Sequence, residues 1–180
     1  QAQERFERSN EDELLTAENP AVRFLGGIGV ICEICGQVWR GGEVMKWVTR
    51  EGAKTDRVAC PRLIKKFIDT GAGFLFVPKD RVLEVARREA GKSFDCPGAD
   101  YTHRDGKCSF EVLIEEYRLQ DPALQMLARI VHGADIPADV GIVPEAAGLQ
   151  AMAHGFAAIC PDDHRKLELE FPVYDALYAW

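Results

Sequence analysis

The sequence predicts an α+β fold, mostly α, in which a small sheet is followed by a cluster of helices. Two observations predict it. Short runs rich in β-branched and aromatic residues, bounded by glycine and proline, fall between residues 45 and 95. From residue 109 onward, apolar residues recur at helical spacing in segments that open with Ser, Asp-Pro or Pro.

The amino-terminal part differs in composition from the rest. Residues 1–20 are polar and acidic, and the next 25 are glycine-rich and contain "CEIC" with Cys32 and Cys35. We place a soft boundary near residue 45, so that 1–45 is an extension of unknown role and 46–180 is the main domain. The "CEIC" pair resembles half of a zinc site, but no second pair follows, and a local disulfide or an inert pair fits equally.

The sheet and its connecting helices are expected between residues 45 and 95. "MKWVT" and "FLFVP" predict strands at 45–49 and 74–78. "TDRVACPRLIKKFID" predicts a helix between them, which begins at Asp56 or, with Pro61 in its first turn, at Cys60. "DRVLEVARREAG" predicts a helix with Asp80 as N-cap. "KSFDCPG" predicts a short strand that runs into a turn.

The remainder predicts a loop and then helices. "THRDGKC" is expected to turn at its Asp-Gly pair. The expected helices begin at five residues that favour helix starts, and these are Ser109, Asp121, Pro144, Pro161 and Pro172.

Composition bounds the function. The chain has 180 residues and a net charge of −7, and its longest apolar run, Phe24 to Cys32, is too short to span a bilayer. No signal peptide is visible, so we expect a cytoplasmic protein without a membrane partner. Because the chain begins with Gln1, we expect a fragment or a processed product. Its acidic balance makes nucleic acid an unlikely partner for this chain alone.

Charge is unevenly distributed along the chain. Residues 1–45 carry four basic and eight acidic side chains, net −4. Residues 46–92 carry twelve basic and six acidic side chains, net +6. Residues 93–180 carry six basic and fifteen acidic side chains, net −9. The basic segment is either a solvated helix face or a local anion site.

The six cysteines are read mostly as free thiols. If a helix begins at Pro61, the Cys60 thiol lies at its N-terminus beside Arg57 and Arg62, where the thiolate or a bound oxyanion is stabilised. Cys108 repeats the pattern before Ser109. The two are therefore candidate catalytic thiols, and the alternative is that each is a small buried core residue.

A divalent metal ion is the candidate cofactor. His103, Asp135 and His164 would offer ligands suited to it, although their spacing matches no defined metal motif. The alternative is that these histidines lie on the surface beside capping acids. Neither a phosphate-binding loop nor a Gly-x-Ser-x-Gly motif is present.

From Trp47 to Trp180 the chain resembles the C-terminal domain of the chromate-resistance ChrB family. The resemblance rests on runs that occur in the family's order, which are "KWVTRE", "DRVACPRLIKKFID", "FLFVP", "HRDGKCSFE", "DPALQMLARIVHGAD", "PEAAGL", "DDH" and "PVYDALYAW". The chain departs from the family at Arg62, where Trp is usual, and in a "HRDG" turn that is one residue longer. Residues 1–45 do not resemble the family's longer N-terminal region, where DNA recognition is expected.

The resemblance implies a role in the bacterial chromate response, as a sensing regulator of an efflux operon or as an accessory resistance protein. The shared pattern comprises Arg50, Arg57, Cys60, His103, Cys108, Asp135, Glu145, Asp163 and His164. Chromate is a tetrahedral dianion, which arginines and a histidine would hold. A thiolate would repel it, so we prefer binding over reduction.

Three hypotheses follow. In the first, the chain binds or senses an oxyanion such as chromate through Arg50, Arg57, His103 and Arg104, and Cys60 or Cys108 reports on redox state. In the second, it is a thiol- or metal-dependent enzyme of redox or sulfur chemistry. In the third, it is part of a DNA-binding regulator. The oligomeric state is left open.

Overall fold

The computed structural model describes residues 22–25, 29–32, 38–39 and 44–180. The chain divides into two compact units, Gln1–Gly42 and Glu43–Trp180. In the first, β1 (Val22–Leu25), β2 (Gly29–Cys32) and β3 (Val38–Trp39) form an antiparallel sheet in the order β1-β2-β3. Of the "CEIC" pair, Cys35 and the side chain of Cys32 lie outside the described residues, so the zinc and disulfide predictions stay open.

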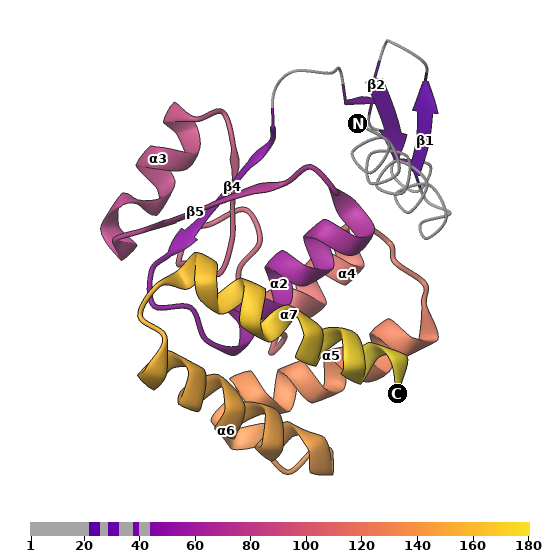
Figure 1. The fold of residues 1–180 in the computed structure, drawn as a ribbon, viewed down its shortest axis with the longest axis vertical. Helices are drawn as coiled ribbons and strands as arrows, with labels where there is room; N and C mark the ends of the chain where they lie inside the picture. Colours follow the sequence, from indigo (N-terminus) through magenta and orange to yellow (C-terminus); the bar gives the residue numbers. More distant parts are fainter. Residues whose placement is uncertain (1–21, 26–28, 33–37, 40–43) are drawn as a thin grey trace, which may run out of the picture. The chain divides into compact units, whose positions relative to one another are not determined.

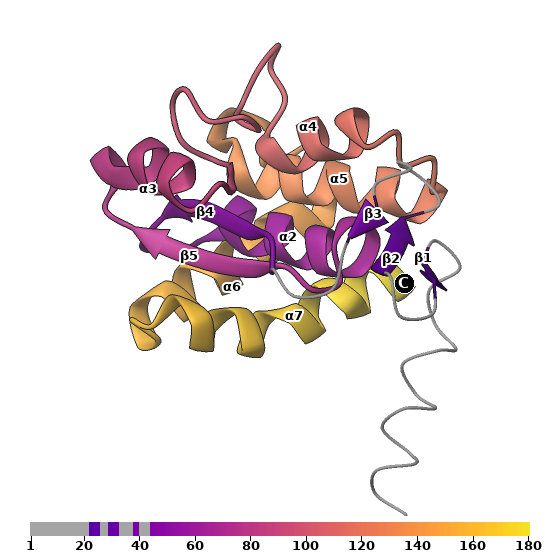
Figure 2. The same cartoon turned by 90° about the horizontal axis from the view of Figure 1, so that it is seen from above.

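The second unit begins with a parallel sheet in the order β5-β4-β6. The central strand β4 (Lys46–Arg50) pairs with β5 (Gly73–Val77) and β6 (Lys92–Ser93). Because parallel neighbours need crossover connections, helices join them. These are α2 (Thr55–Leu63), which continues as the π-helix η1 (Ile64–Ile68), and then η2 (Lys79–Arg81) with α3 (Val82–Arg88). Figure 2 shows β4 and β5 side by side, with α3 beside them.

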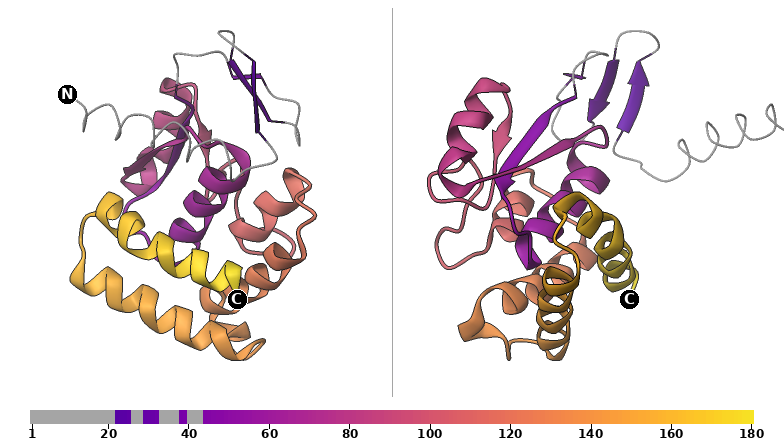
Figure 3. Two further views of the ribbon diagram at one scale, coloured as in Figure 1. Left: turned by 45° about the vertical axis from the view of Figure 1, so that its right-hand side comes forward. Right: turned by 60° about the vertical axis from the view of Figure 1, so that its left-hand side comes forward.

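A helical cluster follows the sheet and completes the mostly α, α+β fold that the sequence predicts. It consists of α4 (Ser109–Glu116), α5 (Pro122–Asp135), η3 (Pro137–Asp139), α6 (Pro144–Ile159) and α7 (Asp163–Ala179). The helix α7 packs against α2, and α6 packs against α5, as Figure 1 and both views of Figure 3 show. None of the helices in the described part of the chain has the length and apolarity needed to cross a membrane.

Successive side chains of β4 point to opposite faces of the sheet, so the strand contributes to a separate part of the core on each face. Trp47 is fully buried in the main core with α2, α4, α5 and α7, and its Nε1 donates to Asp69 Oδ2 at 3.2 Å. Val48 points to the other face, where it packs against Val82 and Val85 of α3. The strand is thus covered on both faces, which places its carboxyl end and the following loop against the helical cluster.

Two proline positions differ from the prediction. The helix α2 begins at Thr55, so Pro61 lies inside it and Cys60 is not at a helix start. Likewise α7 runs through Pro172, and the two helices predicted from 161 and 172 are one. In both cases the helix buries side chains before and after the proline, and this packing outweighs the one hydrogen bond that proline removes. The predicted N-cap Asp80 is also wrong, because it lies in η2 and Arg81 precedes α3.

A buried ion pair ties α7 to the loop between β4 and α2. The Asp163 carboxylate accepts hydrogen bonds from the backbone N–H groups of Gly52 at 2.8 Å and Ala53 at 2.7 Å. Lys166 Nζ donates to Asp163 Oδ1 and to the Ala53 carbonyl, both at 2.9 Å. This contact holds the backbone immediately before the first turn of α2.

Glu170, one turn after Lys166, supplies a stability prediction. It is 1% exposed, its Oε1 has no hydrogen-bond partner among the described residues, and burial raises its pKa to about 7 although Lys166 lowers it. A carboxyl pKa raised by folding means that stability falls as the pH rises from the unfolded value through 7. Glu170→Gln should therefore increase the free energy of unfolding at pH 8 by about 1–3 kcal/mol, which raises the melting temperature by a few degrees. At pH 5 the increase should be much smaller.

Thermal unfolding at the two pH values measures this difference. Glu168→Gln is the matched control, because Glu168 lies on the same helix but is exposed and pairs with Arg165. An equal change at both pH values, or no gain at pH 8, would contradict the assignment.

Candidate functional site

The carboxylate of Asp56, in the first turn of α2, is buried beneath the start of α4. The residue is 1% exposed. Its Oδ2 accepts from Ser109 N–H at 2.7 Å and its Oδ1 from Phe110 N–H at 3.1 Å. It therefore satisfies two of the free N–H groups of α4 from outside the helix. The Cys60 thiol, one turn along α2, donates to Oδ1 at 3.6 Å.

A tight hairpin turns the chain back next to His103. Arg104 and Lys107 exchange backbone hydrogen bonds of 3.2 and 2.9 Å. Between them, Asp105 has φ 54° and Gly106 has φ 76°, as a type I′ turn requires at its two central residues. The predicted Asp-Gly turn is thus confirmed, and it places His103 next to the residues that begin α4.

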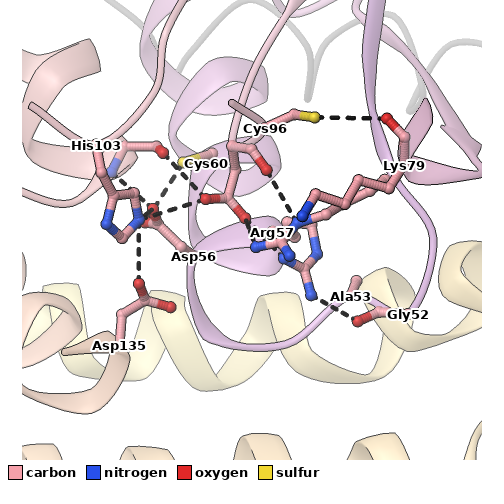
Figure 4. A network of polar contacts seen from close by, with 12 residues as sticks. Gly52, Ala53, Asp56, Arg57, Cys60, Lys79, Cys96, His103 and Asp135 are labelled. Atoms are coloured by element: carbon pink, nitrogen blue, oxygen red, sulfur yellow. Dashed lines mark hydrogen bonds and ion pairs between the residues drawn. The ribbon is translucent and has the colours of Figure 1, made fainter. Parts of the chain in front are cut away.

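Three carboxylates converge on one nitrogen of His103 (Figure 4). Its Nε2 lies 3.3 Å from Asp56 Oδ2, 3.3 Å from Asp95 Oδ1 and 3.2 Å from Asp135 Oδ2. They come from α2, from the segment after β6 and from the end of α5. Ligand atoms of Asp56, His103 and Asp135 all lie within 4.8 Å of one another, which is close enough to hold one metal ion.

The geometry suits a metal ion better than a proton. Asp135 first, and then Asp56 and Asp95, raise the pKa of His103 to about 12, so its ring is an imidazolium at neutral pH. Yet one N–H can be directed at only one of three oxygens, and charge-assisted hydrogen bonds are about 2.7–2.9 Å long. Ligand atoms about 2.0–2.2 Å from a tetrahedral ion are about 3.3–3.6 Å apart, which is close to the distances of 3.2–3.3 Å from His103 Nε2 to the three carboxylate oxygens.

Asp95 faces the site from a strained backbone position. Its φ is 46°, in the left-handed region that non-glycine residues rarely adopt. Its Oδ2 accepts from Arg57 at 2.8 Å and Arg50 at 3.4 Å, and its Oδ1 accepts from Ser109 Oγ at 3.2 Å. Burial alone would raise its pKa, but His103, Arg57 and Arg50 outweigh burial and lower it. The strain and the charge both fit a carboxylate held in place for a function.

A second histidine lies beside this group with partners of its own. His132 Nδ1 is 2.6 Å from Glu111 Oε2, and His132 Nε2 is 3.1 Å from Asp139 Oδ2. The same Glu111 oxygen accepts from Cys108 N–H at 2.9 Å. Burial would lower the pKa of His132, but Glu111 and Asp139 raise it.

The predicted oxyanion ligands are only partly brought together. Arg50 and Arg57 both point at Asp95, and Arg57 also donates to the Gly52 carbonyl at 2.8 Å. Arg104 is exposed and pairs with Glu116. Without a bound cation, an oxyanion beside His103 would meet three carboxylates in place of the expected excess of positive charge.

The candidate catalytic thiols have surroundings that suppress thiolate. Cys60 and Cys108 are both fully buried. Burial first, and then the negative charge of Asp56, raises the pKa of each thiol. Cys108 does lie at the N-terminus of α4, as expected, but Cys60 lies inside α2. Their catalytic role stays a prediction, and the lowered pKa expected for them is not found.

The candidate metal ligands are also divided. His103 and Asp135 meet, whereas the exposed His164 packs its ring against Phe76 with a centroid distance of 5.2 Å. Asp56 and Asp95, which also contact His103, are not among the site residues predicted from the sequence. Asp56 does carry a signal, because it shares the apolar face of its helix with Cys60 and Leu63, where a carboxylate is unexpected. Asp95 carries no comparable local signal.

Comparisons with known proteins bear on the same region. Residues 47–180 match the family model described as ChrB, C-terminal domain. The chain is 36% identical over 137 residues to Protein ChrB of Cupriavidus metallidurans strain CH34, an alignment that covers 74% of this chain and 40% of that protein. The chain thus spans well under half the length of this curated relative. No solved structure matches it.

Burial of the two thiols leads to a labelling prediction. In the native protein at pH 8, Cys60 and Cys108 should react with iodoacetamide at least about tenfold more slowly than in denatured protein, because the reactive thiolate is both suppressed and inaccessible. Mass spectrometry of timed digests measures each cysteine separately. Rapid native labelling of either one would contradict the structure and revive the thiol chemistry predicted from the sequence.

Proposed function

Because the chain belongs to the ChrB family through its C-terminal domain, which associates it with chromate resistance, we propose that it is a chromate-response domain that works with a bound divalent metal ion. The observation that carries the proposal is the convergence of Asp56, Asp95 and Asp135 on His103 Nε2 at 3.2–3.3 Å. The imidazole of His103 and the carboxylates of Asp56 and Asp135 form a ligand set that suits zinc, manganese or ferrous iron. Asp95 lies 3.3 Å from the same imidazole nitrogen.

Oxyanion binding is the finer part of the proposal, and the charges around the site support a role for the metal in it. Without metal, Arg50, Arg57 and imidazolium His103 carry a formal charge of +3 and the three aspartates a formal charge of −3. Burial raises the pKa of Asp56, which disfavours its negative charge. Replacing the His103 proton with a divalent ion gives +4 and −3, a net charge of +1. A bound divalent ion supplies a positive centre that attracts an oxyanion. Arg50 lies on the rim with its side chain 36% exposed, where it can donate to that anion.

The other two hypotheses have less support. A thiol-dependent enzyme would need Cys60 or Cys108 to become accessible and ionised, and both are buried beside a carboxylate. A DNA-binding role is disfavoured by the net charge of −7, because DNA phosphates repel an acidic protein.

The first prediction concerns metal and protons together. Zinc should bind the purified, chelator-treated protein with one-to-one stoichiometry and release close to one proton per ion at pH 7.5, because His103 is protonated before binding. Calorimetry in two buffers of different ionisation enthalpy measures both quantities. Asp135→Asn should weaken zinc binding at least about tenfold.

Asp139→Asn is the matched control. It removes the same charge four residues after Asp135, but the Asp139 carboxylate contacts His132 and not His103. Absence of stoichiometric binding, or equal effects of the two substitutions, would contradict the metal site.

The second prediction concerns chromate. In equilibrium dialysis, zinc-loaded protein should retain chromate, and the metal-free protein should retain at least about tenfold less. In protein saturated with zinc, Arg50→Gln should weaken chromate retention about tenfold, because a charged hydrogen bond to the anion is lost. Arg81→Gln, at an exposed arginine that pairs with Glu84, serves as control. Equal retention with and without zinc would contradict the role assigned to the metal, without bearing on zinc binding itself.

A further inference from the structure

A second concave site lies between α4 and α5, lined by residues that the metal site does not use as ligands. This groove has a volume of about 520 Å³, which is in the range of small-molecule sites. Its apolar lining is contributed by Ile114, Leu119 and Ala128, each about 5% exposed. Its polar lining consists of Lys107, Glu111, Glu115, Arg118, Gln120, Gln125 and Arg129.

The basic residues of the groove stand out from those around them. Residues 93–180 contain six basic and fifteen acidic side chains. Four of the six basic residues pair with a carboxylate, and these are Arg104, Lys107, Arg165 and Lys166. The other two, Arg118 and Arg129, have no ion pair with any residue in the described part of the chain, and both line the groove. Both residues are exposed and line one hollow. Two guanidinium groups without an ion pair in so acidic a segment favour binding of an anion there.

Arg118 also occupies a backbone position that does not suit arginine. It follows α4 with φ 51°, and the Leu119 N–H donates to the Ile114 carbonyl at 3.0 Å, as in the helix-ending motif that usually has glycine at this place. A non-glycine residue is disfavoured there. Local folding therefore does not explain an arginine at this position, whereas a ligand contact does.

The two carboxylates of the groove do not cancel this charge. Glu115 pairs with Lys107. Glu111 is held by Cys108 N–H and His132. The lining thus has three basic and two acidic side chains, and its formal net charge is +1.

We propose that this groove binds a small organic anion, whose carboxylate or phosphate group is held by Arg118 and Arg129 and whose apolar part packs on Ile114, Leu119 and Ala128. The paired guanidinium donors recognise the planar or tetrahedral oxyanion group. The apolar floor distinguishes such a ligand from an inorganic ion. The inference is independent of the metal site and extends the proposed function with a second ligand.

The test uses 1-naphthyl phosphate as the probe, with inorganic phosphate and 1-naphthol as its two halves. Amide resonances of the full chain are followed by NMR during titration, and the largest shifts are expected at Ile114, Leu119 and Ala128. The whole probe should bind at least about tenfold more tightly than either half. Arg129→Gln should weaken the whole probe about tenfold, and Arg165→Gln, which removes an exposed arginine on α7, should not.

Arg118→Gly separates binding from folding. Because glycine suits φ 51°, this variant should keep or raise the melting temperature and still lose probe affinity. The proposal is overturned if the probe binds both variants as it binds the parent, if shifts gather elsewhere, or if inorganic phosphate binds as tightly as the whole probe.

Discussion

The buried carboxylate of Asp56 is the constraint on which the rest of the second unit depends. A charge removed from water must be compensated by hydrogen bonds and opposite charge. Asp56 receives both, from two N–H groups of α4 and from His103. Meeting that requirement brings α2, the start of α4 and the hairpin at 104–107 together. The approach of Asp95 and Asp135 to the same imidazole then creates a site from elements that are far apart in the sequence.

That arrangement bears on the oxyanion site predicted from basic residues beside cysteines. Arg50 and Arg57 are already committed to Asp95, so their charge offsets carboxylates before any ligand arrives. Burial first, and then the negative charge of Asp56, raises the pKa of the Cys60 and Cys108 thiols and keeps them protonated. A divalent metal ion in place of the His103 proton adds one positive charge to this group, and that added charge is the reason for proposing a metal.

Much of the fold could be predicted from the sequence, because its signals are local. The strands at β4 and β5, the Asp-Gly turn and the helices after Cys108 all follow from periodicity, propensity and capping. Pro61 and Pro172 misled the prediction because proline is a strong local signal and the packing that overrides it is not local. The site was half predictable for the same reason. His103 and Asp135 stand out by residue type, whereas the approach of Asp56 and Asp95 depends on tertiary contacts that no spacing reveals.

The most direct test of the central claim is the protonation state of His103 Nε2. Its ¹⁵N chemical shift should be measured at pH 7.5 in the metal-free protein and again after one equivalent of zinc. We expect an imidazolium nitrogen in the metal-free protein that becomes an unprotonated, metal-bound nitrogen when zinc is added. If His103 stays an imidazolium at saturating zinc, the carboxylate–histidine group is not a metal centre. If it is already neutral without metal, the exchange of a proton for the ion is contradicted.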